Sequence, residues 1–295
     1  LRDSTIAFYS EASPSELAGL PYADASIATL WVTAYAVSAF RNTRRKFYLI
    51  QDFEPMFYPA STLYALTEES YRLGLYGICN TQNLLDIYRD DYAGKGMAFT
   101  PAVDRTVFNA DKRAYLPPDA PVTVFVYARP GHWRNCWEMA SLALEELKRR
   151  LGDRVEIVTA GAWAEGAGAA FDIKRLGLLD YRATGQLYQR CDVGLALTVS
   201  KHPSYLPLEL MASGVPVVAF DNPWGHWILK DGENSLLAKR TVDSLADCLE
   251  RMCTERGLRD RLAEQALQDI GARHSDWDGA MSGIYQYLCD PERLD

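Results

Sequence analysis

One segment of the sequence, residues 201–219, combines residue types that can bind a nucleotide. It contains a loop rich in Pro and Ser and then a short helical stretch, with Ser204, Tyr205 and Leu206 at the junction and Glu209 near the helix start. Free amides at a helix start attract phosphate, and a carboxylate beside them can accept both hydroxyls of a ribose. A carboxylate there can also simply favour the helix dipole. The nucleotide interpretation makes a nucleotide-sugar enzyme the leading hypothesis.

A second polar group, Gln51, Asp52 and Glu54, comes directly after the apolar run at residues 46–50. Open α/β sheets place their ligands at the carboxyl ends of their strands. These side chains are therefore candidates for contact with an acceptor sugar or with the hydroxyls of a transferred sugar. The alternative is a buried, hydrogen-bonded turn.

Short apolar runs alternate with segments of helical period, which predicts an α/β fold with parallel sheets. The first part of the chain has predicted helices at 61–74 and 81–92, and predicted strands at 28–32, 46–50, 77–80 and 97–100. Doubly wound domains usually open with a strand and a glycine turn. Because no such turn precedes Trp31, we expect this first domain to be incomplete.

After a Pro-containing linker at 111–121, a fuller series of elements follows. An apolar helix face spans residues 137–151, two helices are expected near 245–252 and 258–266, and a last helix capped by Ser275 runs over 276–289. The predicted strands are at 122–127, 155–159, 192–197 and 215–220. The predicted domains are therefore 1–117 and 118–274, followed by a C-terminal segment at 275–295.

Composition excludes several classes of function. The net charge of −8 argues against a nucleic-acid partner. The basic stretch 41–46 is a local exception, either a solvated helix end and loop or a patch for a membrane surface or an acceptor phosphate. The six cysteines are scattered without a CxxC pair, and the four histidines lack metal-ligand spacing. No apolar run is long enough to span a membrane and no signal peptide is present, so we expect a cytoplasmic location. The chain begins with Leu1, which predicts a piece of a longer protein.

The second domain resembles the C-terminal domain of GT-B fold retaining glycosyltransferases in three motifs, and these motifs lie in the expected order. They are 122–134, with Arg129 and Arg134; 176–193; and 201–209, where Lys201 and Glu209 occupy the positions of two family glutamates. The resemblance implies two Rossmann-like domains facing a cleft, the first on the acceptor side, and a last segment that crosses back to it.

The same resemblance implies roles for single residues. Arg129 and Arg134 would reach the donor diphosphate, although either could be a surface charge, and Lys201 would reach the diphosphate or the sugar ring. Leu178 would lie beside the nucleotide. Gly161 would allow the backbone to approach the nucleotide closely; the alternative is that Gly161 is an ordinary turn glycine. The Asp276-Trp277-Asp278 triplet looks like a metal-binding DxD. It is instead interpreted as a helix start, so neither a metal nor another cofactor is expected.

The first domain is similar to bacterial rhamnosyltransferases that build S-layer and O-antigen glycans. The segments that carry this similarity are 29–35, 48–55, 58–60 and 71–78. The similarity implies dTDP-β-L-rhamnose as donor, a glycan or lipid-linked glycan as acceptor, and possible peripheral contact with the inner face of the plasma membrane. A nucleotide-sugar epimerase of the same fold and a non-catalytic nucleotide-sugar-binding module stay open as alternatives.

Overall fold

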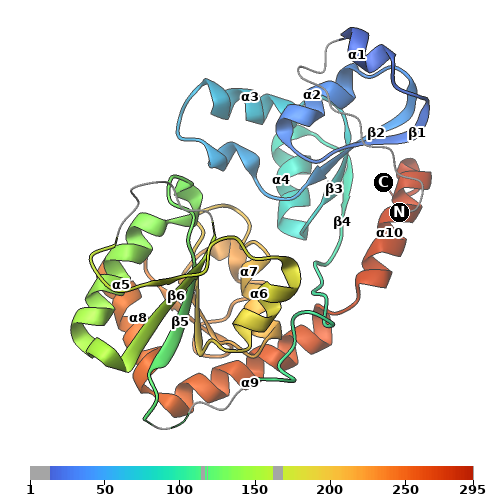
Figure 1. Cartoon of the computed structure of the whole chain (residues 1–295). Coiled ribbons are helices and arrows are strands. Elements are labelled where there is room, and N and C mark those ends of the chain that lie inside the picture. The colour runs from blue at the N-terminus through green and yellow to red at the C-terminus, as the bar shows by residue number, and fades with distance from the viewer. Residues whose placement is uncertain (1–13, 114–116, 118, 162–168, 295) are drawn as a thin grey trace. The chain divides into compact units, whose positions relative to one another are not determined.

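The computed structural model describes residues 14–113, 117, 119–161 and 169–294. These residues divide into two compact units (Figure 1). Unit 1 comprises the described residues up to Phe99 together with those from Met281 on, and unit 2 comprises Thr100–Ala280. The boundary between Phe99 and Thr100 precedes the predicted domain boundary at residue 117. The boundary between Ala280 and Met281 follows the predicted boundary at residue 274.

Unit 1 is built on a parallel four-stranded sheet whose strands lie side by side in chain order. The strands are β1 (Ala23–Ala28), β2 (Thr43–Ile50), β3 (Tyr76–Cys79) and β4 (Gly96–Ala98). The helices before and between them are α1 (Pro14–Ala18), α2 (Trp31–Ala39), α3 (Thr62–Ser70) and α4 (Gln82–Tyr92), with a 3₁₀ turn at Glu54–Phe57. The core is rich in stacked aromatic rings, such as Tyr48 on Tyr71 at a centroid distance of 5.6 Å.

Unit 2 contains a parallel six-stranded sheet in the order β10-β9-β8-β5-β6-β7. The strands are β5 (Val122–Tyr127), β6 (Val155–Ala160), β7 (Lys174–Arg175), β8 (Val193–Ala196), β9 (Val217–Phe220) and β10 (Ser235–Ala238). The chain builds β5, β6 and β7 outward in one direction and then returns to build β8, β9 and β10 in the other. The order therefore reverses between β5 and β8, which is where open α/β sheets bind ligands.

Helices cover both faces of the unit 2 sheet because its strands are apolar on both sides. They are α5 (Trp137–Leu151), α6 (Tyr181–Tyr188), α7 (Leu206–Ala212), α8 (Val242–Thr254) and α9 (Arg256–Arg273). Within β5, Val124 and Val126 pack toward α5 and α8, whereas Phe125 packs toward α6 and α7. The two parallel sheets confirm the predicted α/β fold class.

One predicted strand is wrong. Residues 28–32 were expected to be a strand, but β1 ends at Ala28 and α2 begins at Trp31. The side chain of Thr33 accepts hydrogen bonds from the amides of Thr29 and Leu30, and the amide of Trp31 donates to Glu54 Oε2 at 2.7 Å. These contacts start a helix inside an apolar run, and the periodicity of that run alone does not separate helix from strand.

The last helix, α10 (Trp277–Cys289), is close to its predicted range, but its cap is one residue later. Asp276 Oδ1 accepts from the amide of Gly279 at 2.8 Å, whereas Ser275 Oγ donates back to Gly271 O. Asp276 is thus a helix cap, as the helix-start interpretation of the Asp276-Trp277-Asp278 triplet requires. No group of three metal-ligating side chains occurs among the residues the structure describes. Nor does any helix in those ranges have the length and apolar content to cross a membrane.

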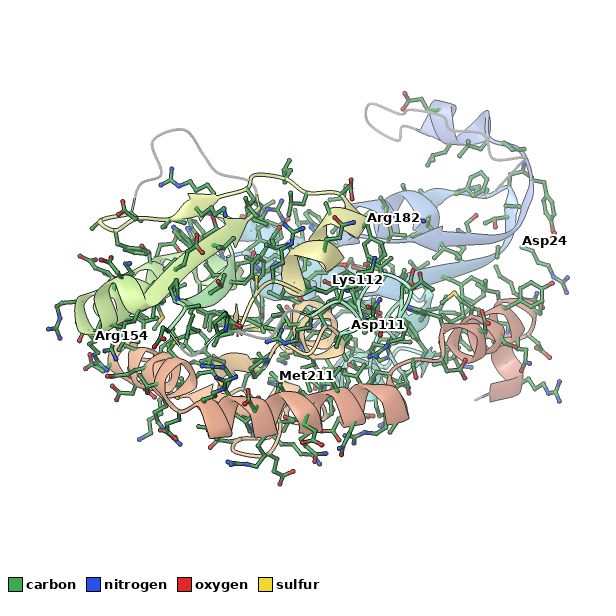
Figure 2. All side chains as sticks on the ribbon, turned by 60° about the horizontal axis from the view of Figure 1, so that its bottom comes forward. Asp24, Asp111, Lys112, Arg154, Arg182 and Met211 are labelled. Atoms are coloured by element: carbon green, nitrogen blue, oxygen red, sulfur yellow. The ribbon has the colours of Figure 1, made fainter. Side chains whose placement is uncertain are left out.

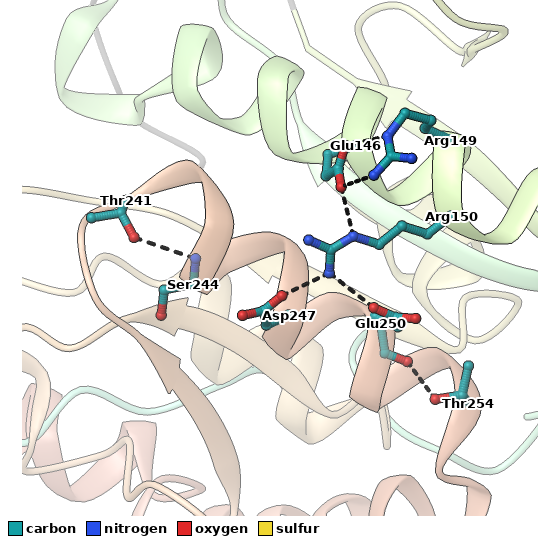
Figure 3. A network of polar contacts seen from close by, with 8 residues as sticks. All are labelled: Glu146, Arg149, Arg150, Thr241, Ser244, Asp247, Glu250 and Thr254. Carbon is teal, nitrogen blue, oxygen red and sulfur yellow. Dashed lines mark hydrogen bonds and ion pairs between the residues drawn. The ribbon is translucent and has the colours of Figure 1, made fainter.

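An ion-pair network joins α5 to α8 on one face of unit 2 (Figure 3). The Arg150 guanidinium lies 2.7 Å from Glu146, 2.7 Å from Asp247 and 2.9 Å from Glu250, and its side chain is only 22% exposed. Arg149 also bonds Glu146, but its side chain is 71% exposed. Several charges that share one half-buried partner stabilise more than isolated surface pairs do.

Replacement of Arg150 by Met keeps the apolar stem and removes the charge. We expect the free energy of unfolding to fall by about 1 kcal/mol at low salt and by less at high salt, because salt screens the pairs. Urea unfolding measures both values. Arg149→Met is the matched control and should leave the unfolding midpoint unchanged; equal effects of the two variants would argue against a network centred on Arg150.

Candidate functional site

A cavity of about 480 Å³ opens in unit 2 at the carboxyl ends of β5, β6 and β8. This volume is within the range of small-molecule sites. The residues that line it are Phe108, Phe125, Val126, Tyr127, Arg129, Arg134, Asn135, Ala160, Gly161, Leu178, Leu179, Tyr181, Thr184, Tyr188, Leu195, Leu197, Ser204, Tyr205, Leu206 and Glu209. The cavity therefore lies at the point where the strand order reverses.

The two predicted arginines both line this cavity. Arg129 follows β5 directly, and Arg134 lies in a 3₁₀ turn at Trp133–Asn135; both are half-buried. Burial and the charges of both arginines lower the pKa of His132. Burial, with a smaller effect of Arg134, lowers the pKa of His202 to about 4. Burial first and the arginine charges second thus disfavour protonation of the two imidazoles, and the arginines are suited to an anionic ligand.

Glu209 provides an acid in the same cavity. It lies in the first turn of α7, and burial raises its pKa to about 7. Burial and then the charge of Glu209 raise the pKa values of Tyr181 and Tyr188, two other residues of the lining. A half-buried carboxylate of raised pKa gains from a ligand that donates hydrogen bonds to it, because those bonds replace the water it has lost.

The loop before α7 is held in an unusual conformation. Ser204 has a φ of +66°, in the left-handed region that non-glycine residues rarely adopt. Its amide donates to Nδ1 of buried His202 at 2.9 Å, and its hydroxyl accepts from the amide of Leu206 at 3.4 Å. One of the helix-start amides predicted to attract phosphate therefore already has a partner. Strain of this kind is typical of binding loops.

Gly161 joins the loops that follow β5 and β6. Its φ is +132°, and an added Cβ would overlap the carbonyl oxygen of Ala128. Its amide donates to Gly177 O at 2.9 Å. Gly161 is thus required by close approach to protein backbone, and it also lines the cavity. Only glycine combines this φ with such a contact.

Lys201 is not among the residues that line the cavity. Its ammonium lies over the ring of Trp224, with Nζ 5.4 Å from the ring centroid. The side chain of Lys201 is half-buried. A role of Lys201 toward the diphosphate or the sugar therefore stays a prediction.

The three candidate acceptor-side residues belong to unit 1. Glu54 is 1% exposed and accepts from the amide of Trp31 and from Tyr48 OH, at 2.7 and 3.0 Å. Asp52 is also buried, and its carboxylate accepts from the amide of Phe53 at 2.7 Å. Gln51 is exposed and donates to Thr29 O at 2.9 Å. The contacts of the two carboxylates are those of a buried, hydrogen-bonded turn, the alternative stated above.

The sequence reasoning missed the aromatic side of the cavity. Phe108 contacts Tyr181 edge-on at 5.0 Å and stacks on Tyr188 at 5.8 Å. Tyr181, Thr184 and Tyr188 lie on one face of α6 because their spacing of three and four residues follows the helical period. That spacing is readable in the sequence, but the contribution of Phe108 from a distant loop is not. The cavity thus has cationic, acidic and aromatic sides.

The α/β architecture is that of the GT-B glycosyltransferase fold. The sucrose-phosphate synthase of Thermosynechococcus elongatus superimposes with a TM-score of 0.71 at 15% identity, covering 91% of this chain and 74% of that one. HepE from Anabaena, solved in complex with UDP and glucose, superimposes with a TM-score of 0.68 at 17% identity, covering 90% of this chain and 78% of that one.

Sequence comparison gives nearer relatives. Residues 122–250 match the family model of the WsaF C-terminal domain, and residues 19–81 match that of the WsaF N-terminal domain. The chain is 40% identical over 277 residues to the O-antigen biosynthesis protein RfbC of Myxococcus xanthus. That alignment covers 93% of this chain and 21% of RfbC, so the chain spans about a fifth of that relative's length.

Gly161→Ala should disrupt the cavity, because the new methyl group meets the Ala128 backbone and the φ is strained. We expect a loss of unfolding free energy of about 3 kcal/mol or more. Gly177→Ala is the control, since its φ is +69° but its Cβ would meet nothing within 4 Å, and it should cost about 1 kcal/mol. Denaturant unfolding of both variants measures the difference; similar costs would show that the Ala128 contact is unimportant.

Proposed function

We propose that this chain is a glycosyltransferase that binds a nucleotide-sugar donor in the cavity of unit 2. The observation that carries this proposal is that Arg129, Arg134 and Glu209 line one cavity at the reversal of strand order. The arginines suit a diphosphate, Glu209 suits the two ribose hydroxyls, and the aromatic side suits a base. Leu178, Ser204, Tyr205 and Leu206 complete the nucleotide site.

In the proposed reaction, the bond between the anomeric carbon and the phosphate oxygen breaks, and its electron pair stays on the diphosphate. Arg129 and Arg134 stabilise this developing charge, and donors placed in this way are worth about 3–4 kcal/mol each in a transition state. The acceptor hydroxyl oxygen bonds to the anomeric carbon and gives its proton to the leaving phosphate on the same face. Configuration is then retained, without a side-chain base and without a metal.

For the donor we propose dTDP-β-L-rhamnose and for the acceptor a growing bacterial polysaccharide. The support is the resemblance of the unit 1 segments to rhamnosyltransferases and the 40% identity to a protein named for O-antigen biosynthesis. Lys201, in place of a glutamate, is compatible with a sugar that lacks a 6-hydroxyl, because an ammonium donates hydrogen bonds and cannot accept them. Unit 1 would supply the acceptor side, with exposed Gln51 as the candidate contact.

Arg129→Ala and Arg134→Ala should each lower kcat/KM for dTDP-rhamnose at least about a hundredfold, or about 2.7 kcal/mol. Arg154→Ala is the matched control, because Arg154 directly precedes β6 (Figure 2), whereas the cavity lies at the carboxyl end of that strand. Steady-state transfer assays give these values, and near-normal activity in either cavity variant would end the diphosphate role.

The same assays separate the three hypotheses when combined with calorimetric titration of dTDP and UDP. Transfer to an acceptor supports the proposal. Interconversion of free nucleotide sugar indicates an epimerase, and nucleotide binding without either reaction indicates a binding module.

The raised pKa of Glu209 predicts a pH effect on stability. Because the folded protein holds this proton more tightly than the unfolded chain, stability falls as pH rises from about 4.5 to about 7. Glu209→Gln should remove up to about 3 kcal/mol of that dependence. Thermal unfolding of both proteins across this pH range measures the difference, and parallel curves would contradict the raised pKa of Glu209.

Nucleotide binding should reverse this preference, because ribose hydroxyls that donate to Glu209 favour its ionised form. Titration of dTDP near pH 7 in buffers of different ionisation enthalpy should therefore show proton release. Glu209→Gln should bind dTDP more weakly and release fewer protons. Unchanged affinity in that variant would mean that the ribose assignment is wrong.

A further inference from the structure

The outer side of α2 in unit 1 carries no charged residue. The helix has the sequence WVTAYAVSA, and only Trp31 and Ala34 in it are buried. Helices at a protein surface usually present charged residues to water. Helix α4 of the same unit does so, since Arg89 pairs with Asp86 and Asp90 on its exposed side. The composition of α2 is therefore unusual for a helix that faces only water.

Large apolar side chains are exposed on α2 and on the neighbouring α3. Leu30, the N-cap residue of α2, and Val32, Leu63 and Leu66 are each between 41% and 51% exposed. The hydroxyl of Tyr35 on α2 donates to Leu66 O at 2.7 Å, so the two helices lie side by side. We call these four apolar residues the α2–α3 surface. Exposed apolar groups that cluster in this way mark interaction sites.

Basic residues lie at the C-terminal end of α2. Arg41 comes two residues after the helix, Arg44 is the second residue of β2, and both are exposed. Lys46, two residues further along β2, donates to Ser38 O of α2 at 2.5 Å. Because side chains alternate along a strand, Arg44 lies on the same side of the sheet as Lys46 and α2.

The charges of the two arginines are not neutralised by ion pairs. Among the residues that the structure describes, no acid lies within ion-pair distance of Arg41 or Arg44. Both acids of α3 pair with Arg72. Asp24 is the acid nearest to Arg44 in the pairing of β1 with β2. The region thus keeps an excess of positive charge, in a chain whose net charge is −8.

We propose that the α2–α3 surface, with Arg41 and Arg44 beside it, binds the face of an anionic lipid bilayer. Apolar side chains enter the boundary between headgroups and acyl chains, and adjacent arginines attract anionic headgroups. An acidic protein would use the arginines but has no need of the leucines, and an apolar partner has no need of the arginines. The surface belongs to unit 1 and does not involve the cavity of unit 2.

Sedimentation of the whole chain with lipid vesicles tests this proposal. The chain should bind vesicles that contain phosphatidylglycerol more tightly than vesicles of phosphatidylcholine alone. Arg41→Gln and Arg44→Gln should each weaken this binding about fivefold at low salt, and Asp24→Asn should strengthen it. Leu66→Ser should weaken it about fivefold at low and at high salt, because salt screens only the contribution of the charges.

Two matched controls come from outside the surface. Arg45 points to the opposite side of the sheet from Arg44, as does Phe47, which packs against Tyr287 of α10 at a centroid distance of 5.8 Å. Leu142 is an exposed leucine of α5 in unit 2. Arg45→Gln and Leu142→Ser should leave vesicle binding unchanged, and thermal unfolding of each variant verifies that it is folded.

Three results would overturn the proposal. They are equal losses in the control and surface variants, no preference for phosphatidylglycerol, and no binding to any vesicle. Binding to poly-L-glutamate without binding to vesicles would indicate an acidic protein as the partner instead. None of these results affects the proposed donor site, which nucleotide titration tests separately.

Discussion

The close approach of two backbone segments at Gly161 is the constraint on which the candidate site depends. The amide of Ala128 donates to Ala160 O, and the amide of Gly161 donates to Gly177 O, each at 2.9 Å. The first bond continues the pairing of β5 with β6 past the ends of these strands, and the second continues the pairing of β6 with the segment after β7. Arg129 follows Ala128 directly, so its position depends on the space that a missing side chain leaves.

The cavity brings basic and acidic side chains, Arg129, Arg134 and Glu209, together in a small volume. Burial and then the charges of two arginines lower the pKa of His132, burial and then Arg134 lower the pKa of His202, and burial raises the pKa of Glu209 to about 7. Basic and acidic side chains that line one cavity suit a ligand that carries both an anion and hydrogen-bond donors. A nucleoside diphosphate supplies both, with phosphate oxygens for the arginines and ribose hydroxyls for the acid.

Unit 1 shows how similar residue types serve structure. Glu54 lies just after a strand of a parallel sheet, as a ligand-binding acid would, yet its carboxylate accepts the amide of Trp31 and the hydroxyl of Tyr48. It thereby starts α2 inside an apolar run. The same contact explains why a helix begins at Trp31 within the predicted strand 28–32, because a partner 23 residues away decides the local conformation.

The sequence by itself determined the α/β class, most strands, and the motifs around Arg129, Arg134 and Glu209, since apolar periodicity and residue spacing are local properties. Tertiary structure alone decided the rest. It brought Phe108 against α6, placed Lys201 on Trp224 instead of in the cavity lining, and gave the buried acids of unit 1 their partners. Each of these contacts joins segments far apart in the chain, and a pattern within one segment carries no information about the other.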